Sequence, residues 1–156
     1  MNASIRIASL SDAHSLLEWR NDSVVRQFSK SSEHINENEH IFWLKTRLPK
    51  CNKEPLFIFM LGDLAAGTAR LDCVLEDEKS LEISILLDPQ YQGQGNAKVL
   101  LDLVYNYAIE KLQAEVIIAY IHSENIRSVK LFESAGFKYS NKKGFFLKYQ
   151  KQHRRA

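Results

Sequence analysis

The sequence predicts a mixed α/β (α+β) fold, with helices flanking a central sheet, from three observations. Short apolar runs typical of strands alternate with longer segments whose apolar residues recur at helical spacing. Glycine and polar residues separate these segments as turns and helix caps do. With 156 residues, 45% of them hydrophobic and 26% charged, the chain is long enough for one domain, residues 1–156, with a sizeable core. The expected order is β-α-α-β-β-β-α-β-α-β-β.

The N-terminal half is expected to form a strand, two helices and a hairpin. The expected elements are a strand over Ser4–Ala8, a helix capped by Ser11 or Asp12 and running to about Arg20, a helix over about Glu37–Leu48 capped by Asn36 with Glu39, strands over Leu56–Leu61 and Leu64–Leu71 joined at Gly62-Asp63, and an acidic, solvated turn over Glu76–Ser80. Arg20 falls on the apolar stripe of its helix, and a cation there is unusual.

The C-terminal half is expected to alternate strands with two amphipathic helices. The expected elements are a strand over Leu81–Leu87, a helix over Asn96–Leu112, a strand over Val116–Ile121, a helix that begins after a cap at Ser123 or Asn125 and ends before Gly136, and short strands near Phe137–Tyr139 and Gly144–Lys148. Gly136 is suited to the left-handed position that follows a helix.

Composition excludes several classes of protein. A net charge of +2 is too small for a typical nucleic-acid binder, and the basic tail Lys148–Ala156 is expected to be a solvated terminus. The sequence contains no apolar run that would span a bilayer and no secretory signal, so we expect no membrane contact. Cys51 and Cys73 lack metal-type spacing, so we expect no metal, free thiols and a cytoplasmic protein.

A glycine-rich hexapeptide directly follows the strand that ends at Leu87. Its residues are Gln92, Gly93, Gln94, Gly95, Asn96 and Ala97. The segment matches neither the dinucleotide fingerprint G-x-G-x-x-G nor the P-loop. Small residues at a helix start leave main-chain N–H groups open to an anion such as a pyrophosphate. A tight strand-to-helix turn without a ligand is the alternative for this segment by itself.

Two motifs together resemble the GNAT superfamily of N-acyltransferases. The hexapeptide fits the pattern Q/R-x-x-G-x-G/A of its acyl-CoA pyrophosphate loop, and Asn125 to Phe137 resembles its second signature, an Asn-x-x-Ser/Ala helix that ends in Gly-Phe. The motifs occur in the order that the superfamily has. The resemblance covers nearly the whole chain and implies a mostly antiparallel central sheet.

The resemblance implies acetyl-CoA as cofactor and assigns residues to it. Main-chain amides of Gln92–Ala97 would hold the pyrophosphate, and the edge formed by Ile85, Leu86 and Leu87 would pair with the pantetheine arm where the neighbouring strand diverges. One amide near Leu86 would meet the thioester oxygen as negative charge develops. The remaining residues implied to contact the cofactor are Asn125, Ser128 and Phe132.

Acetyl transfer requires a neutral amine, and the sequence offers two candidate bases. Glu82 lies on the strand before the loop, where the superfamily often carries a base, although a carboxylate on a solvated strand edge is an equal alternative. His122 ends the neighbouring strand and ranks lower, because a histidine in a loop is more often simply exposed. Many family members carry a Tyr proposed to protonate the thiolate where this chain has Phe132. Tyr120, Tyr139 or water would replace it.

The first half of the chain is expected to bind the acceptor amine. It resembles acetyltransferases that act on nucleotide-linked amino sugars, such as those of the pseudaminic-acid pathway for flagellin and surface glycans. The residues implied to bind such a substrate are Trp19, Arg20, Asn21, Arg26 and Trp43. An arginine would pair with the diphosphate and Trp43 would stack on a base or sugar, while core packing is the more frequent role for Trp19.

The sequence is also compatible with other classes of acceptor. Protein N-terminal acetyltransferases of the ribosomal-protein type begin similarly, and an aminoglycoside acetyltransferase would favour an acidic cleft. Phe132 also leaves open a CoA-binding module without catalysis. A homodimer is a further possibility for the assembly of the chain.

Overall fold

The computed structural model of the chain describes residues 2–153 and contains one seven-stranded sheet of order β1-β2-β3-β4-β5-β7-β6. All neighbouring strands are antiparallel except β4 and β5, which are parallel. This confirms the expected mixed, mostly antiparallel sheet. The strands are β1 (Ala3–Ile7), β2 (Leu56–Leu61), β3 (Leu64–Val74), β4 (Asp77–Leu87), β5 (Val116–His122), β6 (Lys138–Lys143) and β7 (Phe146–Gln152).

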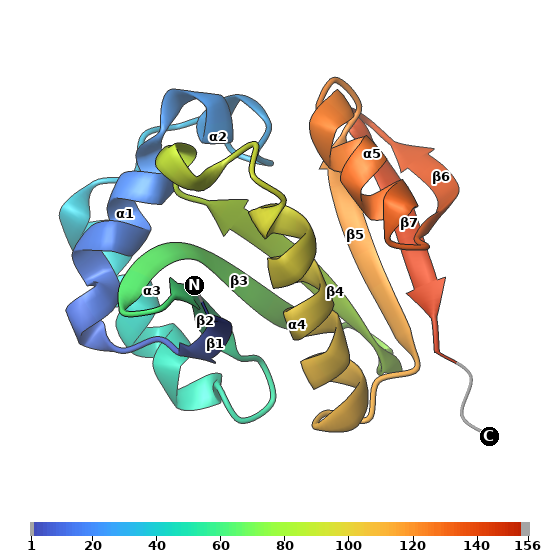
Figure 1. Cartoon of the computed structure of the whole chain (residues 1–156), viewed down its shortest axis with the longest axis horizontal. Helices are drawn as coiled ribbons and strands as arrows, with labels where there is room; N and C mark the ends of the chain where they lie inside the picture. Colours follow the sequence, from blue (N-terminus) through green and yellow to red (C-terminus); the bar gives the residue numbers. More distant parts are fainter. Residues whose placement is uncertain (1, 154–156) are drawn as a thin grey trace.

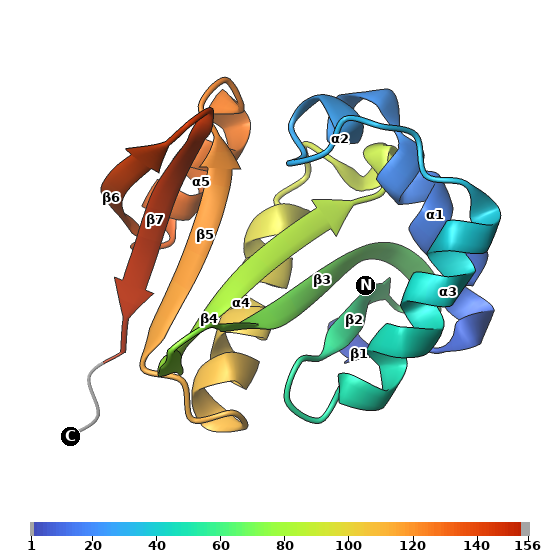
Figure 2. The same ribbon diagram turned by 180° about the vertical axis from the view of Figure 1, so that it is seen from behind.

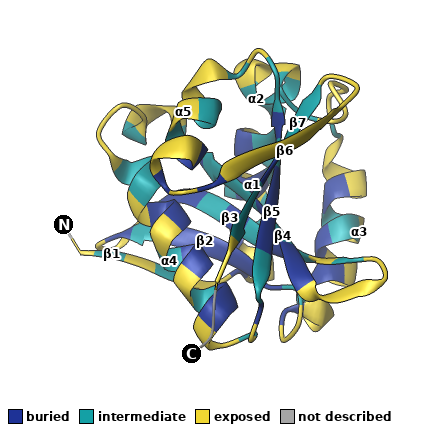
Figure 3. Cartoon of the chain, turned by 90° about the vertical axis from the view of Figure 1, so that its right-hand side faces the viewer, coloured by how far each residue is buried: buried dark blue, intermediate teal, exposed yellow. Residues whose placement is uncertain are grey.

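Helices cover both faces of this sheet (Figure 1). They are α1 (Ala13–Asn21), α2 (Ser23–Gln27), α3 (Glu37–Arg47), α4 (Asn96–Glu110) and α5 (Ile126–Ser134), with short 3-10 turns η1 (Leu10–Asp12), η2 (Leu48–Lys50) and η3 (Pro89–Tyr91). On one face α4 buries Leu100, Leu101 and Val104 completely. On the other face Leu16 of α1 and Leu44 of α3 join a second buried cluster. Figure 3 shows the buried residues between these layers and the exposed edge at β6.

Local capping explains where two of the helices begin and one ends. The Asn36 side chain accepts a hydrogen bond from the Glu39 N–H at 2.8 Å before α3, which confirms that cap. Asn125, rather than Ser123, caps α5 by accepting from the Ser128 N–H at 3.3 Å. Gly136 follows α5 with φ +91°, the left-handed conformation expected there.

The first helix begins differently from the prediction. Neither Ser11 nor Asp12 caps α1 with its side chain. Instead, the Asp12 carboxylate accepts from the Ser9 N–H at 2.9 Å and pairs with Arg6 at 2.8 Å, so that it fixes the turn η1 before the helix. The short helix α2 was not expected either, and the Asp22 side chain caps it by accepting from the Val24 N–H at 3.0 Å.

Several strands are longer than the sequence predicted. The acidic segment Glu76–Ser80 is not a loop, because β4 already begins at Asp77 and Glu76 makes the tight turn with φ +66°. The segment Lys148–Gln152 is not a solvated tail, since it belongs to β7 and pairs with β5. The tail residues 154–156 lie outside the described residues. None of the helices described for residues 2–153 has the length and apolar composition that a membrane crossing requires.

Candidate active site

Strands β4 and β5 pair only where they begin. Their register ends at Glu82 opposite Ile118, and within residues 2–153 β4 has no partner on this side beyond that point. Figure 2 shows the two strands diverging from there. A cavity of about 1040 Å³ lies at this opening and extends between α1, α2 and α5. The divergence therefore leaves one edge of β4 open along Ile83–Leu87.

The main-chain direction of β4 decides which amides face the cavity. The Asp88 N–H donates to the Ala66 carbonyl at 2.9 Å, toward β3. Successive N–H groups of a strand point to opposite sides, so the Leu86 N–H, opposite Thr68, also points toward β3. The N–H groups of Ile85 and Leu87 point toward the opening. An amide of Ile85 or Leu87, rather than that of Leu86, therefore matches the expected contact with a thioester oxygen.

The glycine loop presents free donors to the same cavity. Among the described residues, the main-chain N–H groups from Gly93 to Lys98 have no acceptor, and the first bonded amide is that of Val99, which donates to the Gly95 carbonyl at 3.4 Å. Gly95 precedes α4 with φ +83°. Unpaired amides at the start of a long helix form an anion site, so these residues fit the pyrophosphate of a coenzyme A.

Individual side chains of the loop have different roles. Gln94 and Asn96 do not line the cavity. Their amide groups donate to the carbonyls of Gln90 and Tyr91 and hold the loop in shape. Gln92 lines the cavity and donates to the Leu87 carbonyl at 3.4 Å.

Helix α5 forms the wall opposite β4. Asn125, Ser128 and Phe132 all line the cavity. Asn125 already uses its side-chain oxygen to cap the helix, which leaves its NH₂ group for a ligand. Phe132 is only 4% exposed and packs edge-on against Phe137 at 5.0 Å between ring centroids.

Arg127 is a cavity residue that the sequence analysis missed. Its guanidinium donates to the Gln92 side chain at 3.4 Å and lies over Gly93, where a Cβ would be 3.4 Å from it. A cation in the first turn of a helix opposes the helix dipole. That unfavourable position was the signal in the sequence, because a phosphate bound between Arg127 and the loop would compensate it.

The expected catalytic side chains lie together on the opposite face of the sheet from α4. Glu82, Tyr120 and His122 all line the large cavity. His122 accepts a hydrogen bond from the Glu124 N–H at its Nδ1, with 3.1 Å between the nitrogens. In the neutral ring Nε2 then carries the proton, so no ring nitrogen is left to accept one. Glu82 is therefore the better-placed base of the two.

Cations dominate the part of the cavity between β3 and α1. Arg20 and Arg70 line it. Arg70 pairs with Asp72 at 3.3 Å, whereas within residues 2–153 no carboxylate or carbonyl pairs with Arg20. Burial lowers the pKa of Arg20, and the nearby Arg70 lowers it further. Buried His40 stacks on Trp43 with 5.8 Å between ring centroids, and burial lowers the pKa of His40. This chamber is suited to a ligand that carries negative charge.

Comparison with known proteins agrees with this geometry. The acetyltransferase (GNAT) domain matches residues 4–138, most of the chain. The chain belongs to the GNAT acetyltransferase family. Acetyltransferase PseH of Campylobacter jejuni is 28% identical over 138 residues, 88% of this chain and 84% of the relative.

Solved GNAT structures share the fold at low identity. The structure of yncA from Salmonella typhimurium with its cofactor acetyl-CoA has a TM-score of 0.81 at 21% identity and covers 100% of this chain and 97% of that one. Spermidine N-acetyltransferase from Vibrio cholerae with CoA and spermine has a TM-score of 0.81 at 18% identity and covers 95% and 92%. The family match makes this chain an acetyltransferase, and solved structures of the same fold contain acetyl-CoA or CoA.

In this GNAT acetyltransferase, three residues expected at the acceptor do not line the cavity. Trp19 is 4% exposed and donates its indole N–H to Asp88 at 2.9 Å. The Asn21 side chain both donates to and accepts from the Ile35 main chain at 2.8 Å, and Arg26 donates to the Asn21 carbonyl at 3.2 Å. These contacts shape the walls of the chamber, whereas Arg20 and Trp43 line it.

Proposed function

We propose that this enzyme transfers the acetyl group of acetyl-CoA to a primary amine on a nucleotide-linked amino sugar. The observation that carries the proposal is the guanidinium of Arg20, which lies beside Arg70 in the acceptor chamber and has no partner within residues 2–153. Arg70 already pairs with Asp72 at 3.3 Å, whereas Arg20 has no partner among the described residues, so a bound anion would supply the counter-charge that Arg20 lacks. A sugar nucleotide carries such an anion as its diphosphate. The similarity to PseH supports the same class of acceptor.

In the proposed reaction, main-chain amides and Arg127 bind acetyl-CoA, and side chains on the acceptor face transfer protons. Acetyl-CoA supplies the acetyl group as an activated thioester. The amides of Gly93–Lys98 and Arg127 bind its phosphates, and the edge at Ile85 and Leu87 binds its arm. The amide of Ile85 or Leu87 binds the thioester oxygen and stabilises the charge that develops on it.

Proton transfer is assigned to the acceptor face. Glu82 takes a proton from the acceptor's ammonium, directly or through a water molecule, so that the amine becomes a nucleophile. Phe132 has no hydroxyl group to protonate the departing thiolate. The Tyr120 hydroxyl or water fills that role, and a thiolate leaves readily enough to need only weak assistance.

The experiment that tests this proposal compares acceptors by the release of the CoA thiol. We expect turnover with a UDP-linked amino sugar and much weaker turnover with spermidine, an aminoglycoside or a peptide N-terminus, because polycations would be repelled by Arg20 and Arg70. Arg20→Gln should raise KM for the sugar nucleotide and leave acetyl-CoA affinity unchanged. Turnover confined to a polyamine or to a peptide would contradict the proposal.

A further inference from the structure

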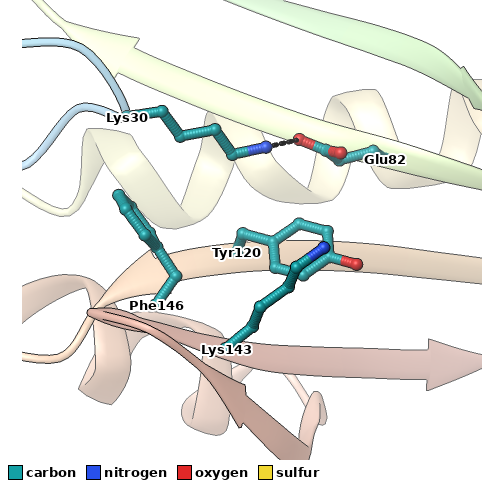
Figure 4. A pocket seen from close by; sticks show the side chains of 5 residues that line it. All are labelled: Lys30, Glu82, Tyr120, Lys143 and Phe146. Atoms are coloured by element: carbon teal, nitrogen blue, oxygen red, sulfur yellow. Dashed lines mark hydrogen bonds and ion pairs between the residues drawn. The ribbon is translucent and has the colours of Figure 1, made fainter.

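Lys30 lies with its ammonium between a carboxylate and an aromatic ring at the edge of the site. Its Nζ is 3.4 Å from Glu82 Oε2 and 4.8 Å from the centroid of the Tyr120 ring (Figure 4). Glu82 forms no other ion pair or side-chain hydrogen bond among the described residues. A carboxylate beside the face of a ring is a general arrangement for binding an ammonium group.

The ion pair between Lys30 and Glu82 contributes little to the stability of the fold. The Lys30 side chain is 63% exposed and that of Glu82 is 22% exposed, and such ion pairs add little to stability. Lys30 belongs to the segment between α2 and α3, which is held by Asn21 at Ile35 and by the Ser29 hydroxyl on Val25. Between these two contacts, the side chain of Lys30 reaches Glu82 of β4, which lies 52 positions later in the chain.

The space around this ammonium opens into the acceptor chamber. A small cavity of about 380 Å³ is lined by Lys30, Glu82, Tyr120, Lys143 and Phe146. All of these except Lys143 also line the large cavity. A ligand in the chamber therefore reaches Glu82 and Tyr120 along a continuous surface, and it meets the Lys30 ammonium there.

We propose that Glu82 and Tyr120 form the subsite for the acceptor's ammonium and that Lys30 occupies this subsite as an internal competitor until the acceptor displaces it. The inference rests on the proposed function, in which Glu82 takes the proton from that ammonium. Acceptor binding thus exchanges one ammonium for another at Glu82, without leaving the carboxylate unpaired.

Steady-state kinetics on Lys30→Met test the competition. We expect KM for the amino-sugar acceptor to fall roughly two- to tenfold with kcat unchanged, the range that an exposed ion pair and a cation–π contact contribute. Lys30→Arg keeps a cation and should retain a KM near that of the wild type. Lys143→Met is the matched control, because Lys143 lines the same small cavity without a carboxylate partner among residues 2–153. A KM that is unchanged or raised in Lys30→Met would overturn the inference.

A second measurement needs neither acetyl-CoA nor turnover. Reductive methylation, read by peptide mass spectrometry, reports how accessible each lysine is. Tetramethylammonium, which cannot itself be methylated, should bind at Glu82 and Tyr120 and accelerate labelling of Lys30 but not of Lys143. If labelling of Lys30 is unaffected while the wild type turns over its acceptor, the inference fails and the proposed function stands. If labelling responds but no acceptor is turned over, the subsite stands and the proposed function fails.

Discussion

Trp19 joins the first helix to the loop that begins the proposed cofactor site. Its buried indole donates to Asp88 Oδ2 at 2.9 Å, and the other oxygen of the same carboxylate accepts from the Gln90 N–H at 3.0 Å. Asp88 thereby fixes both the start of η3 and its distance from α1. A residue expected to contact the acceptor thus supports the cofactor side of the site.

Trp19→Phe should lower the free energy of unfolding by about 1–3 kcal/mol, because it leaves one acceptor of a partly buried carboxylate without its donor. It should also raise the Kd for acetyl-CoA, since Asp88 then holds η3 less firmly. Urea denaturation and calorimetry measure the two effects. Trp43→Phe is the control, because the Trp43 indole N–H has no partner among residues 2–153. Wild-type affinity for acetyl-CoA in Trp19→Phe would refute this role.

Glu82→Gln should reduce kcat/KM roughly 10²–10⁴-fold, the usual contribution of a general base, while acetyl-CoA affinity stays unchanged. The reason is that successive side chains of β4 point to opposite faces of the sheet, so Glu82 lies on the acceptor face and Ile83 and Ile85 lie on the other. Thiol-release kinetics and calorimetry separate the two quantities. Glu39→Gln removes another carboxylate that lines the cavity and should have little effect. Full activity in Glu82→Gln would assign the proton transfer to another group.

At the scale of elements, glycine is required at two positions beside the candidate site, for two different reasons. A Cβ at Gly67 would lie 2.5 Å from the Leu86 carbonyl oxygen, so the close approach of β3 and β4 requires glycine there. At Gly95 the requirement is different. Its φ of +83° is left-handed, but a Cβ would meet nothing within 4 Å.

Gly95→Ala and Gly144→Ala form a matched pair of substitutions. Both glycines are left-handed, both have open space around a Cβ, and Gly144 lies in the β6–β7 turn. Each substitution should therefore lower stability by about 1–2 kcal/mol through backbone strain. Only Gly95→Ala should weaken acetyl-CoA binding, because its methyl group enters the space before α4. Equal affinities in the two variants would argue against a pyrophosphate site at this loop.

The sequence predicted those elements that carry their own local signal. Strand β4, helix α4 and strand β5 have clear apolar patterns, and α5 has both a cap and a terminal glycine. Helix α2 is too short to show a period, and its cap at Asp22 was not recognised. A short strand was expected near Phe137–Tyr139, but the exposed sequence Lys138–Lys143 of β6 has no apolar alternation, so its full length depends on pairing with β7. The acidic start of β4 also lacks apolar alternation, and it is part of the strand because Asp77 pairs with Val74 of β3.

At the scale of the molecule, sequence reasoning named the residues of two local motifs that line the cavity of the candidate site. The glycine loop and α5 were recognisable because the residues of each lie close together in the chain. The acceptor chamber combines α1, α3, β3, β4 and the segment between α2 and α3, so Arg70 and Lys30 were missed. Arg20 was noticed because its charge contradicts the apolar stripe of its helix. Trp19, Asn21 and Arg26 were assigned by resemblance, and their partners were known only from the fold.

The sheet itself consists of two parts that share a short seam. Strands β1–β4 with α1, α3 and α4 form one part, and β5–β7 with α5 form the other. The seam between β4 and β5 spans only Ser80 to Glu82 on one side and Val116 to Ile118 on the other. The loop before α4 belongs to the first part and Arg127 to the second. A ligand that contacts both therefore adds connections across the opening.

We therefore predict that acetyl-CoA stabilises the whole molecule and protects the open edge of β4. At a concentration 100 times its Kd the gain should be about 2.7 kcal/mol, measured as a rise in Tm. Hydrogen exchange should slow at the amides of Ile85 and Leu87, which face the opening and have no strand partner there.

ADP is the control ligand, because it offers phosphates to the loop and Arg127 but has no arm to pair with β4. ADP should raise Tm without protecting Ile85 and Leu87. Equal protection by ADP and acetyl-CoA would mean that the arm does not lie along this edge.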